Sequence, residues 1–186
     1  MSGQLHEFVH PERFVAGTVG EPGERTFYLQ ASDGARIVSV ALEKGQVAAL
    51  AERLDELLDE VRRRKPEADV PATAPPELED VAPLGAPIEE EFRVGALALA
   101  WEDDTSEVIV EAQSLEDEPG AEATEESAEF TGDLLRVRLQ PGHARAFAKR
   151  ALRVVAAGRP PCPLCGNPLD PSGHICPRQN GHRGPH

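Results

Sequence analysis

The sequence predicts an α+β protein made of a duplicated β-β-β-α unit, followed by a small zinc-ribbon-like tail. Three observations predict it: short strand-like runs precede each of two amphipathic helical segments, the strand-to-helix junction recurs, and every cysteine lies near the C-terminus. Two such units could pair about a pseudo-two-fold axis into one largely antiparallel, six-stranded sheet or half-barrel with two helices. That pairing would leave a groove between the repeats.

The first unit spans residues 1–65. Strands are expected at 14–19, 26–30 and 36–42, with a tight-turn signal at 32–35 before the third strand. Gly45 then precedes an amphipathic helix over 46–64. The apolar stripe of this helix has helical spacing and consists of Val47, Leu50, Leu54, Leu57, Leu58 and Val61.

The second unit spans residues 89–158. It repeats the order with strands at 92–97, 107–111 and 134–139 and a helix over 142–156. The two junctions align without a gap. The matched pairs are Val40 with Val137, Leu42 with Leu139, Gly45 with Gly142, Ala49 with Ala146, Leu50 with Phe147, Ala51 with Ala148 and Arg53 with Arg150.

Two polar segments interrupt these units. Residues 66–88, rich in proline, alanine and acid, are expected to form an extended linker, and residues 115–129 an acidic loop. Either segment is a candidate for binding a partner, although a solvated connection is the favoured interpretation.

The charge is unevenly distributed along the chain. The net charge is −14, but from residue 134 onward nine Lys or Arg face one carboxylate, which gives +8 and leaves −22 for the first 133 residues. This basic C-terminal third is a candidate surface for an anionic partner, nucleic acid included. The favoured alternative is that it pairs with the acidic part of the same chain or is only a solvated helix face. No stretch has the length of a membrane span, and cysteines confined to one cluster suit a reducing compartment. We therefore expect a soluble, cytoplasmic protein.

The tail, residues 159–186, carries the pattern of a metal site. Cys162 and Cys165 form a Cys-x-x-Cys knuckle, and His174 and Cys176 complete three thiolates and one imidazole, the donor set of a structural Zn²⁺. His182 is a rival fourth ligand. A redox dithiol is the alternative, but that motif usually opens a helix, whereas prolines and glycines flank this one. A closed four-ligand site would fold the tail rather than perform chemistry.

The remaining motifs give no catalytic constellation. His6-Glu7-Phe8-Val9-His10 matches the His-Glu-x-x-His pattern of metalloproteases, yet no apolar helical stripe surrounds it and Pro11 disfavours helical geometry at His10. A strand or entry segment with an accidental match is the favoured interpretation. His143, at the start of the second helix, and the equivalent pair Arg53 and Arg150 are candidate anion-binding residues. They could share one site or form internal ion pairs.

The chain resembles an uncharacterised family of actinobacterial proteins, a domain of unknown function sometimes labelled only "repeat protein". The resemblance runs through residues 11–20 and 23–31, through 92–95, and through the tail motifs Cys162-Pro163-Leu164-Cys165-Gly166 and Gly173-His174-Ile175-Cys176-Pro177. It implies the repeat and the metal tail, and no particular reaction.

The sequence therefore favours a zinc-stabilised, non-enzymatic binding or adaptor protein with an unknown protein or other anionic ligand as its partner. The alternative is an enzyme acting on a phosphorylated small molecule or nucleic acid in the groove between the repeats. A concave pocket that gathers Arg53, Arg150 and His143 would favour the enzyme.

Overall fold

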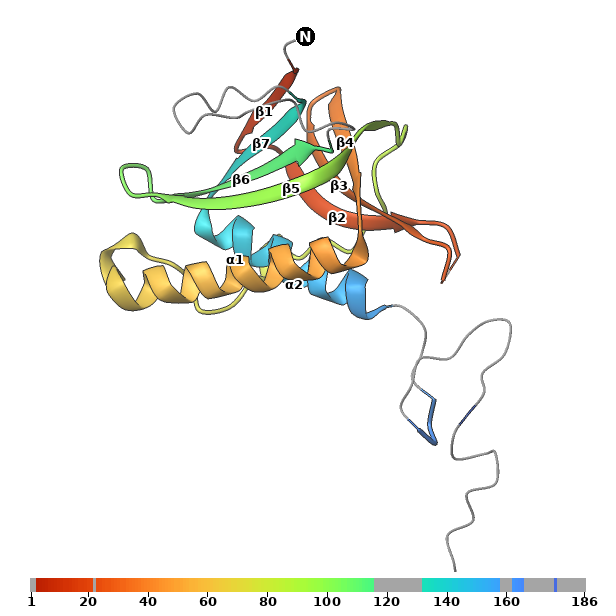
Figure 1. Cartoon of the computed structure of the whole chain (residues 1–186). Coiled ribbons are helices and arrows are strands. Elements are labelled where there is room, and N and C mark those ends of the chain that lie inside the picture. The colour runs from red at the N-terminus through yellow and green to blue at the C-terminus, as the bar shows by residue number, and fades with distance from the viewer. Residues whose placement is uncertain (1–2, 22, 116–131, 158–161, 166–175, 177–186) are drawn as a thin grey trace, which may run out of the picture.

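A computed structural model describes residues 3–21, 23–115, 132–157, 162–165 and 176. Within this part of the chain, seven strands form one sheet in the order β1-β7-β6-β5-β4-β3-β2 (Figure 1). The elements are β1 (Leu5–Val9), β2 (Arg13–Val19), β3 (Thr26–Asp33), β4 (Arg36–Leu42), α1 (Lys44–Arg64), β5 (Glu90–Glu102), β6 (Glu107–Ser114), β7 (Leu134–Leu139) and α2 (Pro141–Ala156). Short 3₁₀ turns, η1 (Pro66–Ala68) and η2 (Pro76–Leu78), follow α1.

The order β-β-β-α predicted from the sequence occurs twice, as β2-β3-β4-α1 and β5-β6-β7-α2. Pairing within each unit is antiparallel, so the sheet is largely antiparallel as expected. The seam between the units, β4 beside β5, is parallel. A two-fold axis perpendicular to the sheet at this seam would make the two strands antiparallel, so the units are not related in that way. The duplication itself stays a prediction.

The seventh strand, β1, was not part of the predicted sheet. It extends the sheet by pairing in parallel with β7, with Leu5 opposite Leu134 and Val9 opposite Arg138. His6 and Phe8 are buried while Leu5, Glu7 and Val9 are exposed, which is the alternation of a strand with one covered face.

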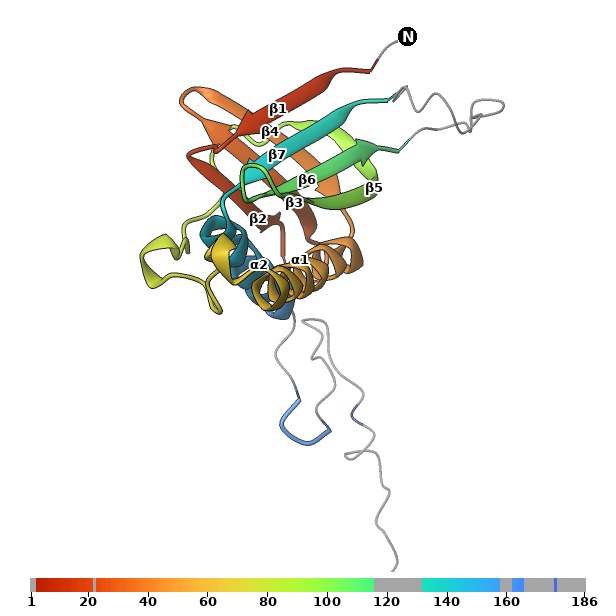
Figure 2. The same ribbon diagram turned by 90° about the vertical axis from the view of Figure 1, so that its left-hand side faces the viewer.

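Both helices cover one face of the curved sheet and lie against each other (Figures 1 and 2). The predicted stripe of α1 is buried against the sheet, except that Leu57 is only partly covered. In α2 the buried face is made by Ala144, Phe147, Ala148 and Ala151, and the Phe147 ring stacks on Phe14 of β2 at 4.5 Å between centroids. The short alanines let the helices approach closely, and the phenylalanine pair fills the space above β2.

The sheet curls enough for distant strands to meet, as expected for a half-barrel. Arg36, at the start of β4, donates from Nη1 to the Glu7 carbonyl of β1 at 2.8 Å, and its guanidinium lies 4.2 Å from the centre of the Phe8 ring. Figure 2 shows β1 crossing near β4. Arg36 thus joins two strands that are far apart in the sheet order.

Several residues of the predicted extended linker pack against the body, although most of the linker is exposed. Val70 is buried in the core, and Leu84 covers Gly17 so closely that a Cβ there would lie 2.5 Å from the leucine Cδ2. Gly85 donates to Gln30 Oε1 at 2.7 Å and accepts from Gln30 Nε2 at 2.9 Å. Proline-rich composition predicts extended backbone but not which surface that backbone follows, which is why the sequence did not predict this packing. Most of the predicted acidic loop lies outside the described residues.

Candidate metal centre and anion-binding residues

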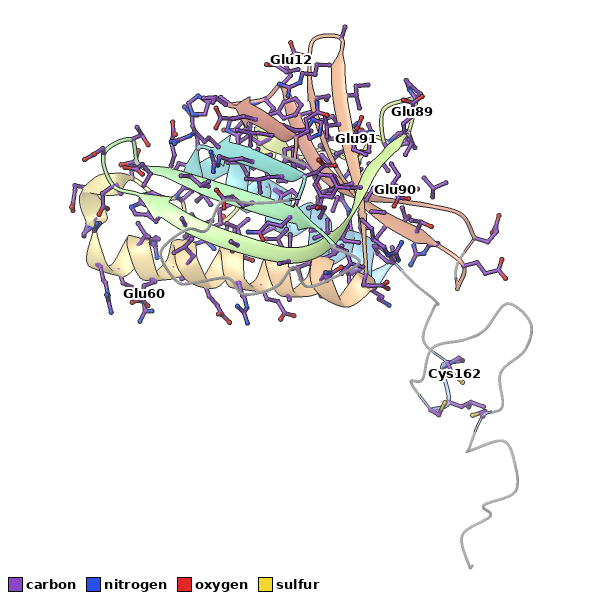
Figure 3. The ribbon with its side chains drawn as sticks, turned by 45° about the horizontal axis from the view of Figure 1, so that its top comes forward. Glu12, Glu60, Glu89, Glu90, Glu91 and Cys162 are labelled. Carbon is purple, nitrogen blue, oxygen red and sulfur yellow. The ribbon has the colours of Figure 1, made fainter. Side chains whose placement is uncertain are left out.

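Three cysteines form the candidate metal centre. The sulfur atoms of Cys162, Cys165 and Cys176 all lie within 4.8 Å of one another, and those of Cys162 and Cys176 are 3.9 Å apart. Thiolates bound tetrahedrally at about 2.3 Å from one ion would have sulfurs about 3.8 Å apart. The cluster therefore has the dimensions of a site that could bind a metal ion. Figure 3 labels the Cys162 side chain, with further sulfur atoms close to it.

The chain around the cluster favours the metal-binding form of the thiol. Residues 163–165 form a turn that directs backbone N–H groups toward the Cys162 sulfur. The hydrogen bond from the Cys165 backbone, followed by that from Leu164, lowers the pKa of Cys162 to about 6. A thiolate is the form that ligates metal, so this sulfur needs little additional deprotonation at neutral pH.

His174, the predicted ligand, and its rival His182 both lie outside the described residues.

The hydrogen bonds of Arg150 are structural and join strand β2 to the linker. Its Nε donates to the Ala16 carbonyl at 2.9 Å, on the edge strand β2. Its Nη1 donates to both the carbonyl and the Oδ1 of Asp80, at 2.8 and 2.9 Å. Burial lowers the pKa of Arg150, and the charge of Asp80 opposes that effect. The guanidinium thus satisfies an edge carbonyl of the sheet and holds residues of the linker.

Asp80 is the common partner of two arginines. Arg13 of β2 donates from Nε to Oδ2 at 2.6 Å and from Nη2 to Oδ1 at 3.0 Å. The hydrogen bond from Arg13 is the main reason that the pKa of Asp80 lies below its usual value, with the charge of Arg150 adding to it. Arg13 comes from the first unit and Arg150 from the second, so Asp80 fastens the linker to both.

The three candidate anion-binding residues do not share a site. His143 and Arg150 line a small cavity of about 120 Å³ together with Arg13, Phe14, Leu78 and Asp80. Arg53 instead lines a larger groove of about 490 Å³ between α1 and β5, beside Gln46, Leu50, Leu57, Leu97 and Leu99. Arg53 is exposed. A groove between the two β-β-β-α units therefore exists, but it contains only one of the three.

Most of the described basic residues from position 134 onward pair with acidic residues of the same chain. The favoured alternative from the sequence thus holds for them, and only Lys149 among the described Lys and Arg of this region has no such partner. The pairs are Arg136 with Glu7 and Glu111, Arg138 with Glu107, Arg145 with Asp55 and Asp59, Arg150 with Asp80, and Arg153 with Glu79.

The His-Glu-x-x-His pattern is not a metalloprotease site. It lies on a strand, where His6 is buried next to the Phe92 ring while Glu7 points to the exposed face. His10 has a left-handed backbone, with φ 49, and its Nε2 lies 2.5 Å from Oε1 of the buried Glu107. Nothing in the local sequence indicates this pair, because the two residues meet only through the pairing of β1, β7 and β6.

Fold and cluster together define an α+β protein with a three-cysteine site that could bind a metal ion. The chain belongs to the family described as "Protein of unknown function (DUF3090)", whose family model matches residues 6–176 and so includes all three cysteines. No curated protein and no solved structure matches the chain. Neither of the two described helices is long and apolar enough to cross a membrane.

Proposed function

We propose that this is a cytoplasmic, non-enzymatic binding or adaptor protein whose tail is folded by a structural Zn²⁺. Cys162, Cys165, Cys176 and His174 are the proposed ligands. The observation that carries the proposal is the approach of three sulfurs to the spacing that a tetrahedral ion requires. Free thiols kept for a metal require a reducing compartment, which supports the cytoplasm.

The donor chemistry supports zinc over harder ions. Thiolates select soft or borderline metals, whereas magnesium and calcium take oxygen ligands. Three thiolates with one imidazole close the coordination sphere, so no position is left for a reacting water. Such an ion stabilises the fold of its segment, because binding free energy becomes folding free energy.

The proposed partner is anionic, and a protein is favoured over nucleic acid. Five arginines of the basic third already pair with carboxylates, which removes most of the described positive surface that a phosphate backbone would contact. Arg53 keeps an exposed guanidinium in the groove between α1 and β5.

The enzymatic alternative is the weaker proposal. It requires Arg53, Arg150 and His143 around one ligand, and these residues line two separate cavities. Arg150 is in addition committed to Ala16 and Asp80.

Metal analysis tests the proposal directly. Protein purified under reducing conditions without chelator should contain about one zinc per chain. Cys165→Ser should lose most of it, whereas the control Leu164→Ser, at an exposed neighbour, should retain it. Absence of zinc from the unmodified protein, or an unchanged zinc content in Cys165→Ser, would contradict the metal assignment. Retention of a partner from lysate that is insensitive to salt would contradict an anionic contact.

A further inference from the structure

The two helices present equivalent residues to two grooves. Positions 46, 49, 50 and 53 of α1 line the groove against β5, and positions 143, 146, 147 and 150 of α2 line the cavity against β2. The spacing is the same in both sets, and each ends on an arginine, Arg53 or Arg150. The strand positions differ, since β5 contributes residues farther along its length than β2 does.

The groove on α2 is filled by residues of the linker. Pro75 and Leu78 cover Gly142, because a Cβ on that glycine would lie 3.3 Å from the proline Cγ and 3.5 Å from the leucine Cδ1. Asp80, two residues after Leu78, places its carboxylate on Arg150 at 2.9 Å. A short acidic segment, with a 3₁₀ turn at Pro76–Leu78 and an aliphatic residue two positions before a carboxylate, is therefore what this kind of groove holds.

The equivalent groove on α1 has no such occupant among the described residues. Gly45, which matches Gly142, has nothing within 4 Å of a built Cβ. Arg53 makes no hydrogen bond or ion pair with any residue in the described part of the chain. The groove has about 490 Å³ where the α2 cavity keeps about 120 Å³, and its floor is apolar, with Leu50 buried and Leu57, Leu97 and Leu99 partly covered.

We propose that the α1–β5 groove binds a short acidic segment of a partner protein, in the way that residues 75–80 fill the groove on α2. An aliphatic side chain of the partner packs on the leucine floor, and a carboxylate two residues later pairs with Arg53. The volume and apolar lining fall within the range of specific binding sites, and the single guanidinium sets orientation. This inference rests on the proposed binding function and names its partner class.

A fluorescein-labelled peptide with the sequence of residues 74–84 is a suitable probe for the full-length protein, followed by fluorescence anisotropy. Saturable binding is expected, weaker at high salt. Arg53→Ala should weaken it about ten-fold, the loss typical of one carboxylate partner. Arg62→Ala, which removes the same charge from an exposed position of α1 outside the groove, should leave it unchanged. Ala49→Glu, an exposed groove position, should abolish it.

Three results would overturn the proposal. The first is no saturable binding by the unmodified protein. The second is binding that is indifferent to Arg53→Ala and Ala49→Glu, which would mean that the peptide displaces the linker on α2. The third is binding at least ten-fold tighter after deletion of residues 116–129, which would make the chain's own acidic segment the occupant. Zinc content measured on the same samples separates the two ideas: a zinc-loaded protein that ignores the peptide refutes only the docking site.

Discussion

Replacement of Asp80 by alanine tests how the linker is attached. The variant loses two hydrogen bonds from Arg13, one from Arg150 and one from the backbone of Ala82. Charge-assisted bonds contribute about 1.5–3 kcal/mol each when buried, but the Asp80 side chain is 30% exposed, so water replaces part of them. Arg150 also keeps its bond to Ala16. We therefore expect a loss of about 3 kcal/mol in the free energy of unfolding, at the low end for breaking a buried pair.

Urea unfolding measured by circular dichroism is the assay. With a slope of about 2 kcal/mol per molar urea, the midpoint should fall by about 1.5 M. Glu77→Ala, an exposed carboxylate of the same segment, should change stability by less than about 0.5 kcal/mol. A similarly small loss in Asp80→Ala would refute the role of Asp80 as a shared anchor.

The pH dependence follows from the direction of the Asp80 pKa. The pKa of Asp80 in the folded protein lies below the ordinary aspartate pKa of 3.8. The carboxylate therefore contributes its full stabilisation above about pH 3.8 and loses it as the pH falls through the folded pKa. The difference between wild type and Asp80→Ala should be constant from about pH 5 to 7 and shrink below about pH 3.8.

Three further predictions concern packing and the metal. Gly17→Ala should lower the free energy of unfolding in urea by about 1–3 kcal/mol, because the new Cβ would meet Leu84. The control Gly45→Ala, where a Cβ would have open space, should be neutral or stabilise by up to about 1 kcal/mol. Equal effects of the two substitutions would contradict the packing of the linker on β2. Phe147→Ala should cost about 3–5 kcal/mol, since the ring is buried and stacked on Phe14, and a thermal-shift loss typical of a surface change would be incompatible with that core. Chelation of the reduced protein should raise the count of titratable thiols to three, and three reactive thiols before chelation would argue against bound metal.

The secondary structure was largely predictable because it depends on local periodicity. The strand at 36–42, the strand at 134–139 and both helices are found within about two residues of their expected bounds. The place of β1 in the sheet, beside β7, and the parallel seam of β4 with β5 were not predicted. Both depend on which distant strands become neighbours, and alternation of apolar residues carries no information about that choice.

The candidate site was predictable only in part, for a related reason. The spacing of Cys162, Cys165 and Cys176 is local enough to indicate a metal, and their sulfurs do converge. The equivalent positions of Arg53 and Arg150 on the two helices could be predicted from the sequence. Their surroundings differ, because Asp80 forms a hydrogen bond with Arg150, whereas Arg53 lines the groove between α1 and β5. A carboxylate in a proline-rich segment looks the same in sequence whether it is solvated or held between two arginines.

The parallel pairing of β1 with β7 also constrains how the protein is made. Leu5 finds its partner Leu134 only after more than a hundred further residues have been synthesised, so β1 stays without its sheet neighbour through most of translation. During that time the apolar side chain of Phe8 has no core to enter, and β7, once made, has an open edge until β1 arrives. Docking of β1 thus covers the free edge of β7 and completes the seven-stranded sheet, which leaves β1 and β2 as its two outer strands.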